Sequence, residues 1–159
     1  MTPASYFRLT ACLALCLMVG GVTGRVTAVE IPTWYAGLVK PSWSPPNFAF
    51  PVVWTLLYVL MGISLWLLWE RGRPGPARTK AIQMFCFQLA LNAAWSPVFF
   101  KAHEVFVAVV IIMFLNVAIA ATIVCAWSAQ RTAAWLLAPY LAWVLYATTL
   151  NAGILALNP

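Results

Sequence analysis

Residues 105–127 have the sequence VFVAVVIIMFLNVAIAATIVCAW, and this stretch contains no charged side chain. A helix needs about 20 apolar residues to cross the hydrocarbon core of a bilayer, so the stretch is long enough to span a membrane. Four further apolar segments flank it. Together they predict an all-α integral membrane protein, a bundle of five transmembrane helices over about residues 6–27, 48–70, 80–100, 105–127 and 133–157.

The composition of the whole chain supports a membrane protein. The 159 residues are 64% hydrophobic and 8% charged, with a mean hydropathy of +0.91, whereas about a quarter of the residues in an ordinary soluble domain are charged. Too few polar residues remain to cover a water-facing surface. Nine basic residues exceed three acidic ones, but they lie between the apolar segments, as charges that flank membrane spans do. We therefore expect one domain over residues 1–159, with membrane lipid and not nucleic acid as its surroundings.

The first apolar segment has a second interpretation. A short basic start, an apolar run and Val26-Thr27-Ala28 resemble a secretory signal with its cleavage site. Arg8 is the only charge that precedes the run, and Arg25 stands just before the site. Both features argue against cleavage, so the sequence favours a retained membrane helix.

The basic residues predict an orientation, because short cytoplasmic loops carry an excess of Lys and Arg. With five spans, the N-terminus and the second and fourth loops share one side. That side holds Arg8, Arg71, Arg73, Arg78, Lys80 and Arg131, and the other side holds Arg25, Lys40 and Lys101. The sequence predicts a cytoplasmic N-terminus.

Loop one, residues 28–47, is the longest connection and is rich in aromatic residues and proline. It contains Trp34-Tyr35 and then the segment KPSWSPP over residues 40–46. Proline fixes the backbone and prevents a regular helix. Two interpretations stay open on the residues alone: an aromatic belt at the membrane interface, or a rigid lid over the end of the bundle.

Several classes of chemistry lack the necessary residues. No Asp or Glu lies in the interior of an expected span, since Glu30, Glu70 and Glu104 are all at the edges, and this argues against a proton-coupled pump or an ion channel. His103 has no second ligand nearby, and the four cysteines fall inside apolar runs, where they are typical packing residues. We expect no metal site, no cofactor and no conventional catalytic residue set.

Aromatic and amide side chains instead share helix faces in three of the spans. The spacing of three or four residues aligns Trp54 with Tyr58 and Leu65; Gln88 with Asn92, Trp95 and Phe99; and Tyr140 with Trp143, Ala147, Leu150 and Asn151. Such faces commonly provide interhelical hydrogen bonds and packing. Three of them in one small bundle also favour a central cavity for a flat, apolar ligand.

Two pairs of small residues have the spacing that permits close helix approach. Gly20-x-x-x-Gly24 would bring the first span close to another helix or to a ligand. Ala90-x-x-x-Ala94 would serve a dimer face. Both spacings are common by chance.

Several motifs resemble those of a known family. The first is Trp34-Tyr35-x-x-Leu38-x-Lys40-Pro41-x-Trp43-x-Pro45-Pro46, and it is followed by PVVWTLLY over residues 51–58. The match resumes at QLALNAAWSPVFF over residues 88–100 and ends with PYLAW over 139–143 and Leu150-Asn151. In this order they are similar to the translocator protein family, also called tryptophan-rich sensory proteins or peripheral benzodiazepine receptors.

The resemblance implies a five-helix bundle that forms a homodimer and has a cavity beneath loop one. The implied ligands are protoporphyrin IX, haem-type tetrapyrroles, sterols and benzodiazepine-type drugs. The helix faces and the resemblance together give these ligand-binding residues: Gly24, Trp34, Pro45, Pro46, Trp54, Tyr58, Asn92, Trp95, Trp143, Ala147 and Leu150. Trp34, Pro45 and Pro46 would belong to the lid, and porphyrin propionates would lie near Lys40 or Arg25.

A receptor or sensor that regulates tetrapyrrole metabolism or a stress response is the function that the resemblance favours. The alternatives are light-dependent porphyrin degradation, with Trp54 and Trp143 implicated, and facilitated tetrapyrrole transport.

Two departures from the family pattern favour a bacterial member over an animal one. No basic residue follows Asn151, where animal members carry a sterol motif, and an aliphatic stretch around Val107 replaces a tryptophan.

Overall fold

A computed structural model describes residues 2–158, and the structure in that range is helical, without a strand. The long apolar runs predicted as spans each form a helix. The elements are α1 (Pro3–Glu30), α2 (Trp34–Gly37), α3 (Ala49–Arg71), α4 (Pro76–Ser96), the π-helix η1 (Pro97–Lys101), α5 (Val105–Ala129) and α6 (Arg131–Leu157).

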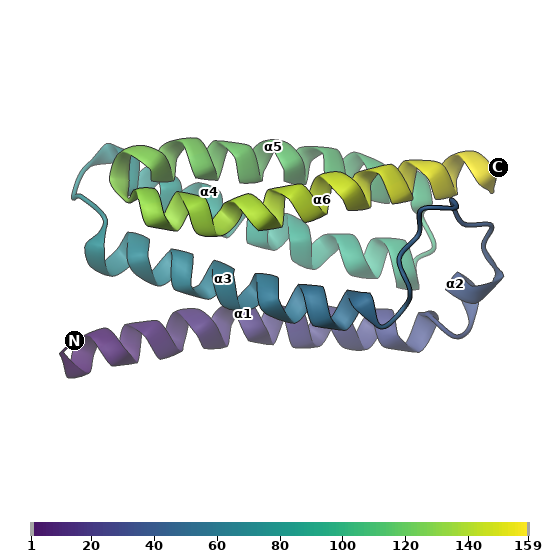
Figure 1. The fold of residues 1–159 in the computed structure, drawn as a ribbon, viewed down its shortest axis with the longest axis horizontal. Helices are drawn as coiled ribbons and strands as arrows, with labels where there is room; N and C mark the ends of the chain where they lie inside the picture. The colour runs from purple at the N-terminus through teal and green to yellow at the C-terminus, as the bar shows by residue number, and fades with distance from the viewer. Residues whose placement is uncertain (1, 159) are drawn as a thin grey trace.

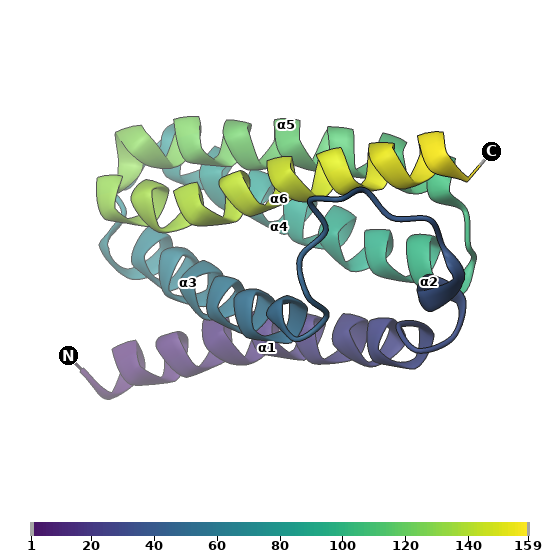
Figure 2. The same cartoon turned by 45° about the vertical axis from the view of Figure 1, so that its right-hand side comes forward.

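The five long helices form a bundle in which the order of contact around the ring is α1, α3, α6, α5, α4 and back to α1. Figure 1 shows α1 and α3 side by side along one edge, with α4, α5 and α6 along the other. The N-terminus and the α3–α4 and α5–α6 turns lie at one end. The short helix α2, the η1–α5 turn and the C-terminus lie at the opposite end, as the turned view in Figure 2 also shows.

Four helices, α1, α3, α5 and α6, are long and apolar enough to cross a membrane. This finding confirms the all-α membrane class, and four of the five expected spans have the length and apolarity to cross a membrane. The exception is α4, because it contains Arg78 and Lys80 in its first turns and Gln88 and Asn92 further along. Gln88 and Asn92 are buried, so the polarity of this helix is directed into the bundle.

The helix that begins with α4 changes its winding at Pro97. Proline has no amide N–H to donate and its ring clashes with the carbonyl four residues earlier. The chain continues as η1, and a single wide turn of this kind inserts one residue into a helix. Phe99 and Phe100 of η1 are buried against Tyr35 of α2, so the wide turn carries aromatic residues into the end of the bundle.

The first helix packs closely on α3. A Cβ atom at Gly62 would lie 3.0 Å from the Cα atom of Leu13, which shows how near the two backbones come. Cys12 and Cys16 are buried in the same contact. Helix α1 continues without a break through residues 26–28, the segment that resembles a signal cleavage site.

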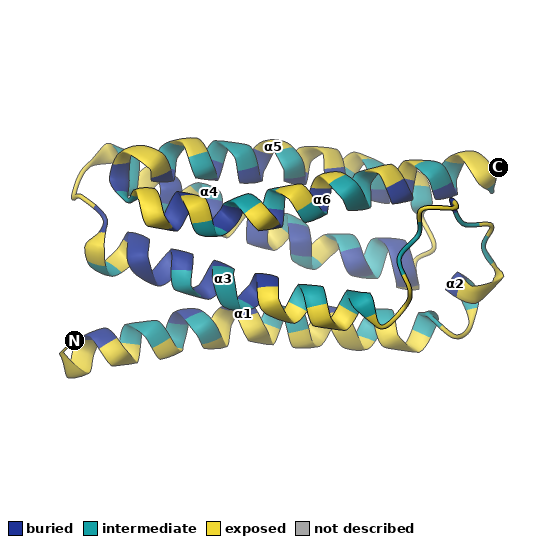
Figure 3. Cartoon of the chain, in the orientation of Figure 1, coloured by how far each residue is buried: buried dark blue, intermediate teal, exposed yellow. Residues whose placement is uncertain are grey.

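Burial within the bundle is concentrated on the inner faces. Figure 3 shows buried residues along the facing sides of α3, α4, α5 and α6, whereas much of α1 is exposed. Many of the exposed residues are large and apolar, such as Phe114 and Val117 on α5 and Met18 on α1. In a helical membrane protein, such a surface faces lipid chains.

Candidate ligand-binding site

A cavity of about 700 Å³ lies between α1, α3, α4 and α6, towards the end of the bundle that carries α2. This volume is within the range of small-molecule sites. The lining residues are Leu17, Gly20, Gly21, Thr23, Gly24, Arg25, Thr27, Ala28, Ile31, Asn47, Phe48, Phe50, Pro51, Trp54, Thr55, Tyr58, Asn92, Trp95, Ser96, Phe100, Trp143 and Ala147. Arg25, Asn47 and Phe48 are also exposed, so the cavity opens to the surface beside loop one.

Aromatic rings from α3, α4, η1 and α6 form much of the cavity wall. The Trp54 ring lies 5.6 Å from that of Tyr58, measured between centroids, and the Phe50 ring lies 6.4 Å from that of Trp143. The Trp95 ring meets Phe100 edge-on at 6.0 Å. Flat π-faces from several directions suit a planar, apolar ligand.

A chain of hydrogen bonds runs from the cavity into the bundle. The Tyr58 hydroxyl donates to Asn92 Oδ1, Asn92 Nδ2 donates to the Tyr140 hydroxyl at 3.1 Å, and Tyr140 donates to Gln88 Oε1 at 2.9 Å. Because the Tyr58 proton is committed to Asn92, the Tyr58 oxygen keeps an acceptor position. Thr23 Oγ1 lies 3.4 Å from it. The chain therefore holds Tyr58 and Asn92 in fixed orientations on the cavity wall.

The indole N–H groups at the site differ in their partners. Trp95 Nε1 donates to Asn151 Oδ1 at 3.0 Å, so this ring is held by α6. Trp143 Nε1 is buried and has no hydrogen-bond partner among residues 2–158. An unpaired buried donor is costly, and the Trp143 ring lacks the polar anchor that Asn151 gives to Trp95.

Seven of the eleven predicted site residues line this cavity: Gly24, Trp54, Tyr58, Asn92, Trp95, Trp143 and Ala147. Leu150 does not line it, because it is buried at the end of the bundle in a small void beside Phe99 and Asn151. Trp34, Pro45 and Pro46 are also absent from the lining.

Helix α1 contributes more to the site than the sequence indicated. Besides Gly24, it provides Gly20, Thr23 and Thr27. Thr27 Oγ1 lies 2.9 Å from Ser96 Oγ, and this contact joins α1 to α4 at the cavity wall. The spacing of residues 20, 24 and 27 along one helix face was the available signal, but glycine and threonine carry little chemical character of their own.

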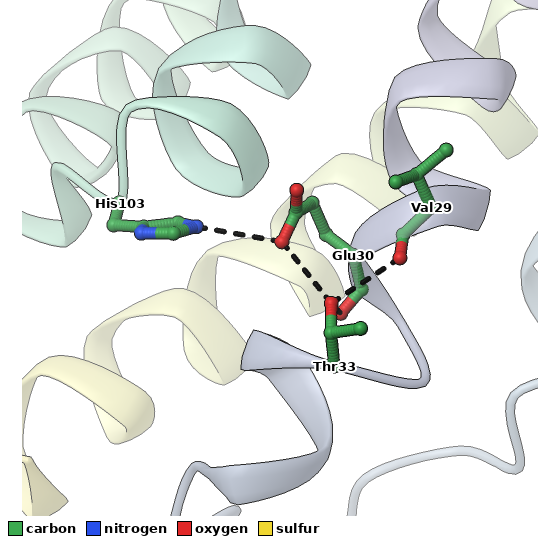
Figure 4. A network of polar contacts seen from close by, with 4 residues as sticks. All are labelled: Val29, Glu30, Thr33 and His103. Carbon is green, nitrogen blue, oxygen red and sulfur yellow. Dashed lines mark hydrogen bonds and ion pairs between the residues drawn. The ribbon is translucent and has the colours of Figure 1, made fainter.

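Trp34 packs against Phe99 of η1 and forms part of a polar cluster at the bundle end. Its ring stacks on His103 at 4.2 Å and 13°. Figure 4 shows His103 Nε2 pointing towards Glu30 Oε2 at 3.5 Å, with Thr33 Oγ1 donating to the same carboxylate at 3.3 Å. His103 has a positive φ of 58°, a backbone conformation that is uncommon for residues other than glycine. The cluster joins α1 and α2 to the η1–α5 turn.

No group of three potential metal ligands occurs within the described part of the chain. The cluster around His103 therefore contains one imidazole and one carboxylate without a third metal-binding side chain.

Loop one is fastened to α6 at three points. Val39 N donates to Asn158 Oδ1 at 3.0 Å, and Asn158 Nδ2 donates to the Val39 carbonyl at 2.9 Å. The Tyr146 hydroxyl donates to the Trp43 carbonyl at 2.6 Å. Gly153 allows Pro41 to approach so closely that a Cβ would overlap the proline ring. The loop thus crosses the end of the bundle along α6.

Lys40 has a structural role within loop one. Its Nζ donates to the Tyr35 carbonyl at 2.8 Å and to the Leu38 carbonyl at 3.2 Å, and it lies 4.8 Å from the Tyr35 ring centroid. Burial, with a smaller contribution from Tyr146, raises the pKa of the Tyr35 phenol, so it stays neutral beside Lys40 at physiological pH. Of the two cations expected near ligand carboxylates, Arg25 lines the cavity and Lys40 does not.

Comparison with known proteins places this architecture in one family. The model of the TspO/MBR family matches residues 12–157, which cover all of α3 to α6 and most of α1. The chain belongs to the TspO/MBR family. Because it has this membership and four apolar helices long enough to span a bilayer, it is an integral membrane protein.

Relatives in the TspO/MBR family cover most of the chain. It is 41% identical over 151 residues to the tryptophan-rich protein TspO of Archaeoglobus fulgidus, which covers 95% of this chain and 97% of the relative. It is 44% identical over 119 residues to the translocator protein of Homo sapiens, covering 74% and 70%. It is 35% identical over 125 residues to the tryptophan-rich sensory protein of Cereibacter sphaeroides, covering 79% and 77%.

Proposed function

We propose that this TspO/MBR family member is a membrane sensor or receptor for protoporphyrin IX and haem-type tetrapyrroles. The observation that carries the proposal is the cavity of about 700 Å³ with Trp54, Trp95 and Trp143 in its wall. Sterols and benzodiazepine-type drugs are smaller apolar ligands that suit the same lining. Relatives named sensory protein and translocator protein support a sensing or receptor role, with regulation of tetrapyrrole metabolism or of a stress response as its output.

The proposed binding mode places the tetrapyrrole plane against the indoles of Trp54 and Trp143. Tyr58 and Asn92 provide polar contacts from the hydrogen-bonded chain. Arg25 is exposed at the open side of the cavity, so the ligand carboxylates would point towards it and stay hydrated.

We further propose that α4 is a fifth span. It contains 21 residues, and a helix rises about 1.5 Å per residue, so it matches the hydrocarbon thickness of about 30 Å. Its buried amides face the bundle and not lipid. Five spans and the excess of basic residues at the N-terminal end support a cytoplasmic N-terminus. The proposed location is a bacterial membrane, on the sequence departures around Val107 and after Asn151.

A homodimer through α4 is part of the proposal, because Ala90 and Ala94 are exposed one turn apart on this helix. We expect the double substitution Ala90→Leu, Ala94→Leu to convert the dimer to a monomer, because larger side chains prevent close helix approach. Light scattering with size-exclusion chromatography in detergent measures the mass. Two exposed alanines of α6, Ala142 and Ala152, provide a control for the same alanine-to-leucine changes on another helix, and a dimer that persists in the α4 variant would contradict this interface.

Titration with protoporphyrin IX tests the main function. Purified protein should show saturable quenching of tryptophan fluorescence and a shift of the porphyrin absorption band, at one ligand per chain. An apolar benzodiazepine-type ligand should compete, because both would occupy one cavity. Quenching that rises linearly without saturation would show partitioning into detergent and would reject the site.

The same samples test the alternative that the protein degrades porphyrin in light. Trp54 and Trp143 line one cavity, so both would contact a bound porphyrin. After illumination, product is counted per protein chain against a dark control. A yield well above one product per chain would indicate turnover, whereas one or less fits a binding protein. Porphyrin flux into liposomes, with and without the protein, tests facilitated transport.

A further inference from the structure

A second charged region lies at the end of the bundle remote from the cavity. It comprises Arg71, Arg73, Arg78 and Arg131, in or beside the α3–α4 and α5–α6 turns. The two turns are joined, because Arg73 N donates to the Ala129 carbonyl at 3.0 Å. Figure 1 shows both turns at the end that carries the N-terminus. We call these four residues the arginine cluster.

The arginine cluster has no internal counter-charge. Of the three carboxylate side chains in the sequence, Glu70 pairs with Arg8 at 2.8 Å and Glu30 lies beside His103 at 3.5 Å. Glu104 belongs to the η1–α5 turn at the opposite end. Within residues 2–158 no ion pair reaches any arginine of the cluster, so an anion that neutralises it must come from outside the chain.

Exposed tryptophans fix the depth of this region in the membrane. The Trp127 and Trp135 rings lie 5.5 Å apart, and 43% and 64% of these residues are exposed. The Arg131 guanidinium lies 5.8 Å from the centroid of the Trp127 ring. Tryptophan prefers the headgroup level of a bilayer. An arginine held over such a ring therefore lies at the level of the lipid phosphates.

We propose that the arginine cluster, with Trp127 and Trp135, is a binding surface for anionic phospholipid headgroups of the surrounding leaflet. Arginine pairs with phosphate through two parallel hydrogen bonds, and four arginines without carboxylates favour a lipid with net negative charge over a zwitterionic one. The tryptophans supply the contact with the acyl region, which free phosphate lacks. This inference does not depend on the tetrapyrrole ligand.

Quenching of tryptophan fluorescence by brominated lipids tests the surface. Protein is reconstituted in mixtures of brominated phosphatidylglycerol and phosphatidylcholine, and the relative binding constant of the two lipids is measured. The wild-type chain should prefer phosphatidylglycerol by at least about fivefold, because a single basic residue at an anionic surface contributes about that factor. The double substitution Arg73→Gln, Arg131→Gln removes half of the cluster and should lower this preference by about fivefold or more.

Lys101→Gln is the control, because Lys101 is an exposed base at the opposite end of the bundle and its loss should leave the preference unchanged. Circular dichroism checks that the variants stay helical. The bond from the N–H of residue 73 to the Ala129 carbonyl is a backbone bond, so a glutamine side chain does not remove it. An unchanged preference in the double variant, or none in the wild type, would overturn the proposal. So would equal thermal stabilisation by inorganic phosphate and by phosphatidylglycerol, which would identify a phosphate site.

Discussion

Loss of both Trp54 and Trp143 to alanine is expected to weaken protoporphyrin IX binding roughly a hundredfold. The two rings line the cavity from α3 and α6, so together they can contact two edges or faces of one planar ligand. A favourable aromatic pair contributes about 0.5–1.5 kcal/mol beyond its buried area. The two pairs contribute about 1–3 kcal/mol and the lost apolar contact area adds to this, so a total near 3 kcal/mol and a change in Kd of about a hundredfold are expected. Fluorescence and absorption titrations measure it.

The control variant for this experiment is Trp66→Phe, Trp69→Ala. It also removes two indoles, so the fluorescence baseline is comparable, but neither residue lines the cavity. Its Kd should stay within about twofold of the wild-type value. An equal loss of affinity in both double variants would show that the effect comes from general destabilisation, and wild-type affinity in the first would remove Trp54 and Trp143 from the site.

Gly20→Ala is expected to destabilise the protein by about 1–3 kcal/mol, the range for overpacking a closely packed contact. A Cβ at residue 20 would overlap the Tyr58 ring. Tyr58 is 4% exposed and bonded to Asn92, so its ring cannot move aside without breaking the chain of hydrogen bonds. The variant should show a lower unfolding temperature in detergent.

Gly21→Ala provides a matched control on the same helix. Apart from the two chain neighbours and the nearby backbone of α1 itself, no atom lies within 4 Å of the position a Cβ would take at residue 21, and alanine is favoured over glycine in a helix by about 1 kcal/mol. This variant should therefore be equally or slightly more stable than the wild type. Opposite signs at adjacent positions would establish the contact between α1 and Tyr58. Similar shifts at both positions would contradict it.

The two predictions concern different sides of one cavity. Trp54 and Trp143 are the large rings that a ligand would contact. Gly20 is the small residue that lets α1 close against Tyr58. Without that close approach, Thr23 Oγ1 would not lie within 3.4 Å of the Tyr58 hydroxyl, and the wall formed by α1 would move outward. Gly20 is thus important to the shape of the cavity, whereas the tryptophans determine its chemistry.

The hydrogen-bonded chain of Tyr58, Asn92, Tyr140 and Gln88 explains why α4 differs from the other helices. Amides in a membrane helix need partners, and here the partners are hydroxyls on α3 and α6. The amides reduce the apolarity of α4 below that of a typical span, yet they connect three helices at the wall of the cavity. The amides that lower the apolarity of α4 therefore also organise the site.

The sequence by itself determined the helical membrane class, because runs such as residues 105–127 can satisfy their backbone only as helices in an apolar medium. It also indicated the aromatic and amide faces, since Trp54 with Tyr58, and Asn92 with Trp95, follow helical spacing. Helix ends lay within about four residues of the expected bounds, as at Pro76 for the segment expected from residue 80.

Only the tertiary structure decided which of those faces meet. The contribution of Gly20 and Thr23, the position of Trp34 outside the cavity and the use of Lys40 within loop one depend on contacts between residues far apart in the chain. The joining of the two arginine-bearing turns at Arg73 and Ala129 is of the same kind. Helical periodicity is a local property, so it shows which residues share a helix face but not which other helix that face contacts. The contacting helix is determined by the packing of all the helices together.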